Sequence, residues 1–181
     1  YSREAFRLIQ EHLETVLVNP DDVISRGQVL LGAAYAGIAI ENSMLGCAHS
    51  AANPLTAHYG TVHGNAVGLL LPHVMRYNSE DPSALTEYAR LALENQLVNR
   101  DATESEAFET LLERVTQLLI AARLPRNLDE LNIPASEIST LAKEASTQWT
   151  AQFNPRSINA EGFSKLYEAA HGTACRTAAN R

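Results

Sequence analysis

Two histidines that could hold a metal ion lie in the stretch LGCAHSAANPLTAHYGTVHGNAVGLLLPHVMRYN, residues 45–78. His49 falls near the end of one predicted helix and His63 opens the next, so their imidazoles could point into one volume and share a cation such as zinc. Two ligands do not complete such a site, because catalytic zinc usually takes three protein ligands and keeps one open position. The spacing alone leaves a second interpretation open, in which both histidines are hydrogen-bonded structural residues near helix ends.

The composition is that of a globular protein without nucleic-acid or membrane-surface character. The chain has 181 residues, 45% of them hydrophobic, and a formal net charge of −7. That charge argues against nucleic acid and anionic lipid, since both need clustered Lys and Arg. Cys47 and Cys175 are far apart and form no CxxC pair, which favours a reducing cytoplasm over a disulfide framework. We expect a single domain over residues 1–181.

Neither a signal peptide nor a membrane span is expected from the hydropathy pattern. The N-terminus opens directly into a charged helical pattern, and the apolar run from Val29 to Ile40 is too short to cross a bilayer. The chain begins at Tyr1 rather than at a methionine, so we interpret it as a piece of a longer protein.

Helical periodicity dominates the chain and predicts an all-α bundle of about seven or eight helices. Asp21 and Asp22 are candidate N-caps for the second helix, whose many small residues favour burial on most sides. Thr103, with Ser105 and Glu106 nearby, predicts a capping box at the start of the helix over residues 103–122. Pro54 should end that helical region and leave residues 55–62 as a loop, and residues 172–181 should fray. The sequence contains no Rossmann fingerprint and no P-loop, so no nucleotide-binding half is recognisable. The predicted helices cover residues 3–17, 23–48, 64–77, 82–95, 103–122, 134–148 and 160–170.

The histidine stretch resembles the C-terminal signature of the iron-containing (group III) alcohol dehydrogenase family. That signature has Gly-x-x-His, a second histidine after three more residues, and then His-Gly after nine more. Here it reads Gly46-Cys47-Ala48-His49, then Asn53, then His63-Gly64, followed by the family-like LLLPHVMRYN. The opening YSREAFRLI and the later FNPRSINAEGFSKLYEAA are also similar to the family, so the likeness covers nearly the whole chain.

The resemblance implies the C-terminal helical domain of a dehydroquinate synthase-like fold. His49 and His63 match two of the family's four metal ligands. The other two, an aspartate and a histidine on one helix, precede the matched region in the family, as does the NAD(P)-binding domain. It implies a divalent metal, Fe²⁺ or in replacement Zn²⁺, and NAD or NADP in the full-length protein. The expected partners are that N-terminal domain, a small alcohol or aldehyde and, for the full-length protein, further copies of itself, without nucleic acid or membrane.

Asn53 departs from the family, which usually places a histidine there for a proton relay. Asparagine exchanges hydrogen bonds but does not titrate near neutral pH. The relay could then run through water, the cofactor ribose or another residue, or the substrate could differ. His58, five residues later, is a candidate substitute, against a role in the surface or in loop packing.

The remaining candidates have structural interpretations. His73 is expected to be partly buried and satisfied by the backbone, and both cysteines are expected to pack rather than to bind metal. His12 and His171 are expected at the surface. Trp149 and Phe153 are expected in the core or as loop anchors, although the resemblance places their region beside the substrate cleft. These residues are therefore not expected to complete the metal site.

The resulting hypothesis is the C-terminal domain of a metal-dependent, NAD(P)-linked alcohol dehydrogenase that interconverts a small alcohol and its aldehyde or ketone. Two alternatives stay open. The isolated chain could be a non-catalytic helical module, since it carries only two of the ligands, or the parent could be a related reductase of the maleylacetate reductase or glycerol dehydrogenase type.

Overall fold

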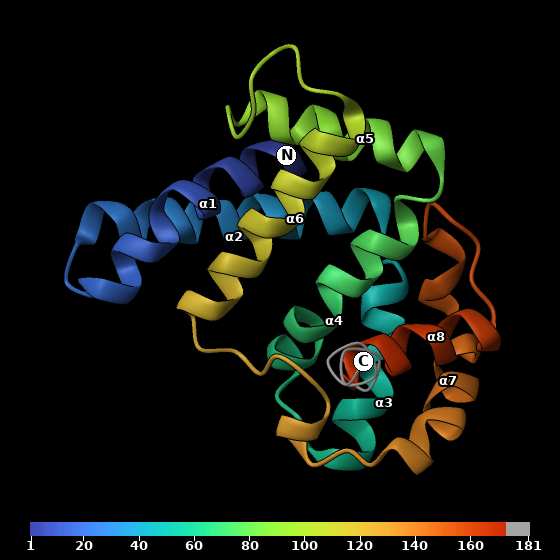
Figure 1. The fold of residues 1–181 in the computed structure, drawn as a ribbon. Helices are drawn as coiled ribbons and strands as arrows, with labels where there is room; N and C mark the ends of the chain where they lie inside the picture. The colour runs from blue at the N-terminus through green and yellow to red at the C-terminus, as the bar shows by residue number, and fades with distance from the viewer. Residues whose placement is uncertain (173–181) are drawn as a thin grey trace, which may run out of the picture. The chain divides into compact units, whose positions relative to one another are not determined.

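The computed structural model describes residues 1–172, which contain eight α-helices, three short 3-10 helices and no strand (Figure 1). The prediction of an all-α fold with seven or eight helices is confirmed for this part of the chain. The predicted fraying of residues 172–181 lies outside the described residues, apart from Gly172. In chain order the α-helices are α1 (Ser2–Val18), α2 (Val23–Ser43), α3 (Cys47–Tyr59), α4 (His63–Asn78), α5 (Pro82–Glu94), α6 (Glu104–Ala121), α7 (Ile138–Thr147) and α8 (Ala160–Ala170), and the 3-10 helices are η1 (Asp129–Leu131), η2 (Ala135–Glu137) and η3 (Trp149–Phe153).

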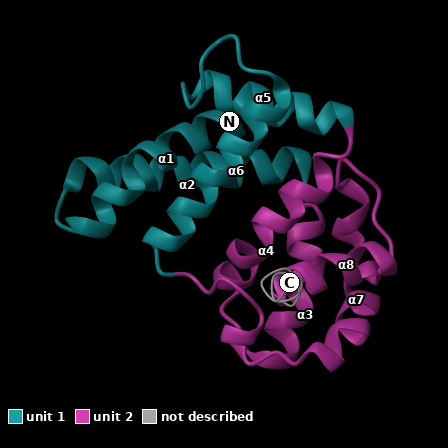
Figure 2. Cartoon of the chain, in the orientation of Figure 1, with its two compact units in different colours: residues 1–44, 82–123 teal, residues 45–81, 124–181 magenta. Residues whose placement is uncertain are grey.

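The helices group into two compact units that alternate along the chain (Figure 2). Unit 1 contains residues 1–44 and 82–123, and so consists of α1, α2, α5 and α6. Unit 2 contains residues 45–81 and the chain from 124 onward, and so holds α3, α4, α7, α8 and the 3-10 helices. Both histidines of the candidate metal pair belong to unit 2. The expectation of a single domain stays a prediction.

Unit 1 is built from the helix pairs α1–α2 and α5–α6, with α1 also contacting α6. Gly32 allows the close approach of α2 to α1, because a Cβ atom there would lie 2.8 Å from Ile9 Cγ1. Of the two predicted N-cap candidates for α2, Asp22 is the one that caps the helix, and the predicted capping box of α6 is confirmed. The Asp22 carboxylate accepts hydrogen bonds from two backbone amides of α2, and Thr103 and Glu106 form a capping box at the start of α6.

Unit 2 surrounds α3, which packs against α4, α7 and η3, while α8 packs against α4 and α7. The centre of the unit is a continuous apolar cluster, and Leu55, Phe163 and Tyr167 are among its fully buried side chains. The Tyr167 hydroxyl donates a hydrogen bond of 2.6 Å to the carbonyl oxygen of Ala51. This bond satisfies the one polar atom of the Tyr167 side chain and fixes α8 against the helix that carries His49.

The predicted single helix over residues 23–48 is wrong, because the chain forms two helices there. Helix α2 ends at Ser43, and Met44 has a positive φ of 66°. Helix α3 then starts at Cys47, whose backbone amide donates to the side-chain oxygen of Asn154. This capping group is 107 residues away in sequence, so helical periodicity carries no signal for it.

Pro54 does not end a helix, and the predicted loop over residues 55–62 is also wrong. Pro54 lies inside α3, which continues to Tyr59. A proline within a helix removes one backbone hydrogen bond. Here Ala51, Ala52 and Leu55 are all fully buried around it, and their packing offsets that loss.

Helix α2 is not buried on most sides, contrary to the sequence expectation. Only Ser25 and Gly32 of its 21 residues are buried. The helix has a mean hydropathy of 1.4 over an 18-residue window, and 11% of that window is buried. In the described part of the chain, α2 alone has the length and the apolar composition to cross a membrane, a test that core helices and signal sequences also pass. The apolar run from Val29 to Ile40 lies inside this helix, so the expectation that the run alone is too short to cross a bilayer does not apply to the helix as a whole.

Candidate metal centre

His49 and His63 lie side by side in unit 2, although 14 residues separate them in sequence. His49 is in the first turn of α3 and His63 is the first residue of α4. Their ring centres are 5.3 Å apart and the ring planes are inclined by 46°. Gly60 makes this meeting possible, because its left-handed conformation (φ 63°) ends α3 and lets α4 begin three residues later.

The spacing of the two rings fits a shared cation. Each imidazole would hold the metal through a nitrogen about 2.0–2.1 Å away, and its ring centre lies about 1.1–1.2 Å behind that nitrogen. For a tetrahedral angle at the metal, the two ring centres are then about 5 Å apart. The observed 5.3 Å agrees with this spacing, and the chemistry of the pair suits Zn²⁺ or Fe²⁺.

The environment of His49 favours neutral imidazole, the form that binds metal. Burial, and then the neighbouring His63 ring, lowers the pKa of His49 below its ordinary value. His63 itself is exposed at the start of α4. Among residues 1–172, no group of three or more His, Cys, Asp and Glu side chains is placed to hold a metal ion. The described residues therefore offer two ligands, and a complete site needs groups from elsewhere.

Asn53 lies one turn after His49 on the same side of α3, and its side-chain amide forms a hydrogen bond within unit 2. Asn53 Nδ2 donates a hydrogen bond of 3.0 Å to Oε1 of Gln148, the residue that caps η3. Asparagine at this position thus connects α3 to the segment after α7. Sequence reasoning identified Asn53 as a departure from the family but gave no indication of its partner, which is 95 residues away.

Two further polar contacts continue this connection along α3 at intervals of three residues. The hydroxyl groups of Ser50 and Thr150 are 2.7 Å apart and buried. The amide of Cys47 donates to Asn154 Oδ1 at 3.2 Å. We name these two contacts, together with the Asn53–Gln148 bond, the α3–η3 register. It positions the first two turns of α3, which carry His49, against the segment from residue 148 to residue 154.

His58 points away from the candidate site. It is five residues after Asn53, which is about 140° around the helix axis. Its Nε2 lies 2.7 Å from the Glu144 carboxylate on α7, and both side chains are a little less than half exposed. The observed contact is a surface pair between α3 and α7, so a role for His58 in place of the family's relay histidine stays an unsupported prediction.

The other histidines and Cys47 lie outside the pair. His73 on α4 has its pKa lowered by burial and then by Arg76. Cys47 is fully buried, and burial raises the pKa of its thiol to about 12, which agrees with a packing role. His12 is partly exposed. The surface expectation for His171 is wrong, because its residue is only 6% exposed at the end of α8.

The expectation that Trp149 and Phe153 belong to the core is also wrong. They are 58% and 44% exposed, and their rings meet edge to face with centres 5.8 Å apart. The segment is anchored instead by Thr150, a buried residue that lies between Trp149 and Phe153 in the sequence. Aromatic residues in a sequence usually indicate a buried core. In this segment the aromatic residues are exposed and the polar Thr150 is buried.

The chain is similar to proteins of one family over most of its length. Residues 1–171 match the family model described as Fe-containing alcohol dehydrogenase family, C-terminal. A 1-propanol dehydrogenase from Citrobacter freundii is 28% identical over 171 residues, which is 92% of this chain and 46% of that protein. A lactaldehyde reductase from Escherichia coli (strain K12) is 32% identical over 143 residues, covering 79% of this chain and 37% of the relative. The chain thus spans less than half the length of these relatives.

Solved structures show the same fold. A crystal structure of a 1,3-propanediol oxidoreductase superposes with a TM-score of 0.88 at 26% identity, covering 93% of this chain and 44% of the other. The iron-containing alcohol dehydrogenase of Thermococcus thioreducens gives a TM-score of 0.80 at 27% identity, covering 94% and 43%. The family resemblance carried by the His49–His63 stretch is therefore confirmed over nearly the whole chain, which belongs to the Fe-containing alcohol dehydrogenase family and forms its C-terminal domain.

Proposed function

We propose that this chain is the metal-supplying half of a metal-dependent, NAD(P)-linked alcohol dehydrogenase that interconverts a small alcohol and its aldehyde or ketone. The observation that carries the proposal is the His49–His63 pair, whose ring spacing fits one shared cation within the family's signature. The names of the relatives, a 1-propanol dehydrogenase and a lactaldehyde reductase, support three-carbon alcohols and aldehydes as the first substrates to test.

In this proposal His49 and His63 hold the cation as neutral imidazoles. The lowered pKa of His49 favours that form, so little proton release is needed for binding. A divalent cation there, Fe²⁺ with Zn²⁺ as the alternative, supplies Lewis-acid chemistry at an alcohol or carbonyl oxygen, and a nicotinamide cofactor supplies the hydride acceptor. The remaining ligands and the cofactor-binding domain belong to the portion of the relatives' length that this chain does not cover.

Asn53 has a positioning role in this proposal, not a proton-transfer role. Its amide does not titrate near neutral pH, and its Nδ2 is bonded to Gln148. It holds the η3 segment beside the turn that carries His49. Proton movement at the substrate oxygen then depends on water or on groups outside the described residues.

The test is metal content and NAD(P)H-linked oxidation of small primary alcohols and diols by the full-length protein that contains this chain. The double variant His49→Ala, His63→Ala should lose bound metal and activity together. His58→Ala is the matched control, since His58 pairs with Glu144 at the surface, and it should keep both. Full activity of the double variant would overturn the proposal.

Assays of the same full-length protein also test the related reductase types as alternatives. Faster turnover of maleylacetate or of glycerol than of any simple primary alcohol would assign the parent to those reductase types instead. We further expect the isolated chain to be inactive, because two imidazoles hold a cation weakly. Turnover by the purified 181-residue chain would refute that expectation. A cytoplasmic location and self-association of the full-length protein complete the proposal.

A further inference from the structure

Helix α2 exposes an apolar face that no other residue of unit 1 covers. Val23 is 79% exposed and Leu30 is 72% exposed, although both are aliphatic. A helix that is apolar around most of its circumference is normally buried against other elements. In unit 1 only the side of α2 that contains Ser25 and Gly32 is buried, against α1.

The three glycines of α2 show which faces are built for close contact. Gly32 faces α1, where an added Cβ would meet Ile9 Cγ1 at 2.8 Å. Gly27 and Gly37 are each five residues from Gly32, one before it and one after it. Each is therefore rotated by about 140° around the helix axis, in opposite directions, and both lie on the side of α2 away from Gly32. A Cβ at either position would meet nothing within 4 Å. Glycine weakens a helix interior, and neither glycine is required by any contact in the described structure.

These two glycines belong to a regular stripe along the side of α2 opposite Gly32. The stripe consists of residues with alternating spacings of four and three, the pattern by which one helix presents a seam to another. Every residue of the stripe is exposed, and each is either small or aliphatic. Small side chains in such a seam let two helix backbones approach closely. We name this stripe the outer face of α2: Val23, Gly27, Leu30, Ala34 and Gly37.

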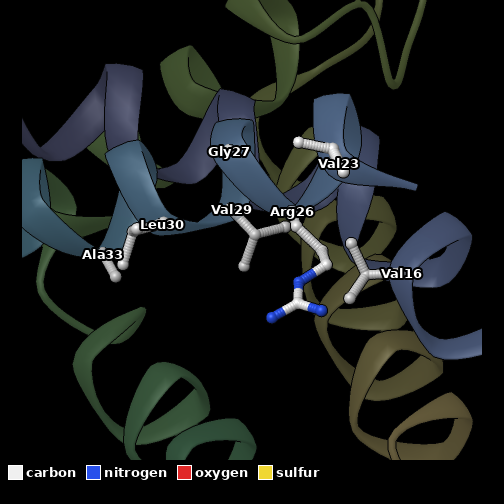
Figure 3. Close-up of a pocket in the computed structure, with 7 residues that line it drawn as sticks. All are labelled: Val16, Val23, Arg26, Gly27, Val29, Leu30 and Ala33. Atoms are coloured by element: carbon white, nitrogen blue, oxygen red, sulfur yellow. The ribbon is translucent and has the colours of Figure 1, made fainter. Parts of the chain in front are cut away.

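An open groove of about 660 Å³ runs beside the outer face (Figure 3). Its walls are aliphatic except for Arg26, whose side chain extends beside Val16 and Val29 in the close-up. Arg26 Nη1 donates to the carbonyl oxygen of Pro20 at 3.1 Å. Among residues 1–172, Arg26 has no carboxylate partner. A complementary segment would therefore combine an apolar stripe with an acidic side chain near Arg26.

We propose that the outer face of α2 is the docking surface for a helix of the polypeptide half that the relatives contain and this chain does not. The matched region is C-terminal and covers 46% of the 1-propanol dehydrogenase, so a comparable length of chain precedes it in that protein. A polypeptide can supply both the apolar side chains for the groove and a carboxylate for Arg26, whereas the chain's net charge of −7 opposes binding to an anionic bilayer. This proposal concerns unit 1 and is independent of metal binding by unit 2.

Cysteine accessibility measures the covering of this face directly. Ala34→Cys places a thiol in the seam, and Glu113→Cys on the exposed side of α6 is the control. Both are made in a Cys175→Ser background, and Cys47 stays because it is fully buried. Each variant is prepared as the 181-residue chain and as a fusion behind the uncovered N-terminal half of the Citrobacter 1-propanol dehydrogenase. We expect fusion to slow maleimide labelling at position 34 by at least about tenfold and to leave position 113 unchanged.

A bulky side chain in the seam provides a second readout. Gly37→Phe has free space in the chain alone, and in the fusion it should restore fast labelling at position 34. Gln117→Phe on the exposed side of α6 should leave the protection intact. The His49→Ala, His63→Ala fusion should also keep it, so loss of metal chemistry and loss of docking are distinguishable.

Three results would overturn the proposal. Equal labelling at position 34 in the chain and in the fusion would show that the added half leaves the face open. Protection of the chain alone that grows with its concentration, together with a dimer mass by light scattering, would assign the face to a second copy. Protection of the chain by phosphatidylcholine–phosphatidylglycerol vesicles, with no protection in the fusion, would assign the face to a membrane.

Discussion

Replacing Thr150 by valine should break the buried centre of the α3–η3 register. Ser50 is fully buried and Thr150 is 4% exposed, so water does not readily replace the lost hydroxyl. The remaining partner of Ser50 Oγ is the carbonyl of Gly46 at 3.4 Å, a long hydrogen bond. Leaving a buried hydroxyl poorly satisfied costs about 1–3 kcal/mol, and we expect Thr150→Val to lower the free energy of unfolding by that amount.

The partly exposed contact of the register should matter less. Asn53→Ala removes the hydrogen bond to Gln148, and Oε1 of Gln148 is then left at a partly exposed position where water can solvate it. Its expected cost is about 0.5–1 kcal/mol. Thr150→Ser retains the hydroxyl and is the control for valine. The expected order of destabilisation is therefore Thr150→Val, then Asn53→Ala, with Thr150→Ser close to the unmodified chain.

The assay uses the single tryptophan of the sequence, Trp149, which lies in η3 itself. Urea unfolding followed by Trp149 fluorescence reports on the segment, and far-UV circular dichroism reports on the helices as a whole. In Thr150→Val the fluorescence transition should move to lower urea. Destabilisation of less than about 0.5 kcal/mol, or equal effects of serine and valine, would refute the reasoning that this buried pair holds the segment.

Two further predictions use sites away from the register. Gly32→Ala should lower the free energy of unfolding by about 1–3 kcal/mol, because its Cβ would press on Ile9, whereas Gly37→Ala, with free space, should raise it by about 0.5–1 kcal/mol in the chain alone. Urea midpoints of both variants check this, and equal effects would contradict it. Burial, and then Arg76, lowers the pKa of His73 from 6.5, so the unfolded state binds more protons and stability should fall as the pH drops below about 6.5. His73→Gln should flatten that decline in midpoints measured from about pH 7.5 to 5.5, and an unchanged slope would contradict it.

Local signals predicted the elements that local chemistry determines. The capping box at Thr103 and the N-cap at Asp22 mark helix starts in the sequence and in the structure, because both act within four residues. The break after Ser43 depends instead on tertiary structure, since Asn154 caps the start of α3 from the other end of the chain. The presence of Pro54 inside α3 likewise reflects burial of the helix around it.

The candidate site divides in the same way. Sequence reasoning identified His49 and His63 through their family signature, and the structure places their rings beside each other. It did not identify Gln148 or Thr150, because ordinary polar residues carry no distinguishing pattern until their partners on α3 are known. The exposed face of α2 was misjudged for a related reason. Its composition indicates burial, and the structure covers only the side facing α1.

Zinc titration of the tag-free 181-residue chain, followed by the imidazole signals of its six histidines in NMR spectra, tests the central claim most directly. We predict that the signals of His49 and His63 shift together as zinc is added, with one cation bound per chain at saturation, and that either His49→Ala or His63→Ala abolishes the response. His58→Ala should leave the titration unchanged, since that side chain pairs with Glu144. Zinc binding of equal strength by the His49→Ala, His63→Ala double variant would contradict the account.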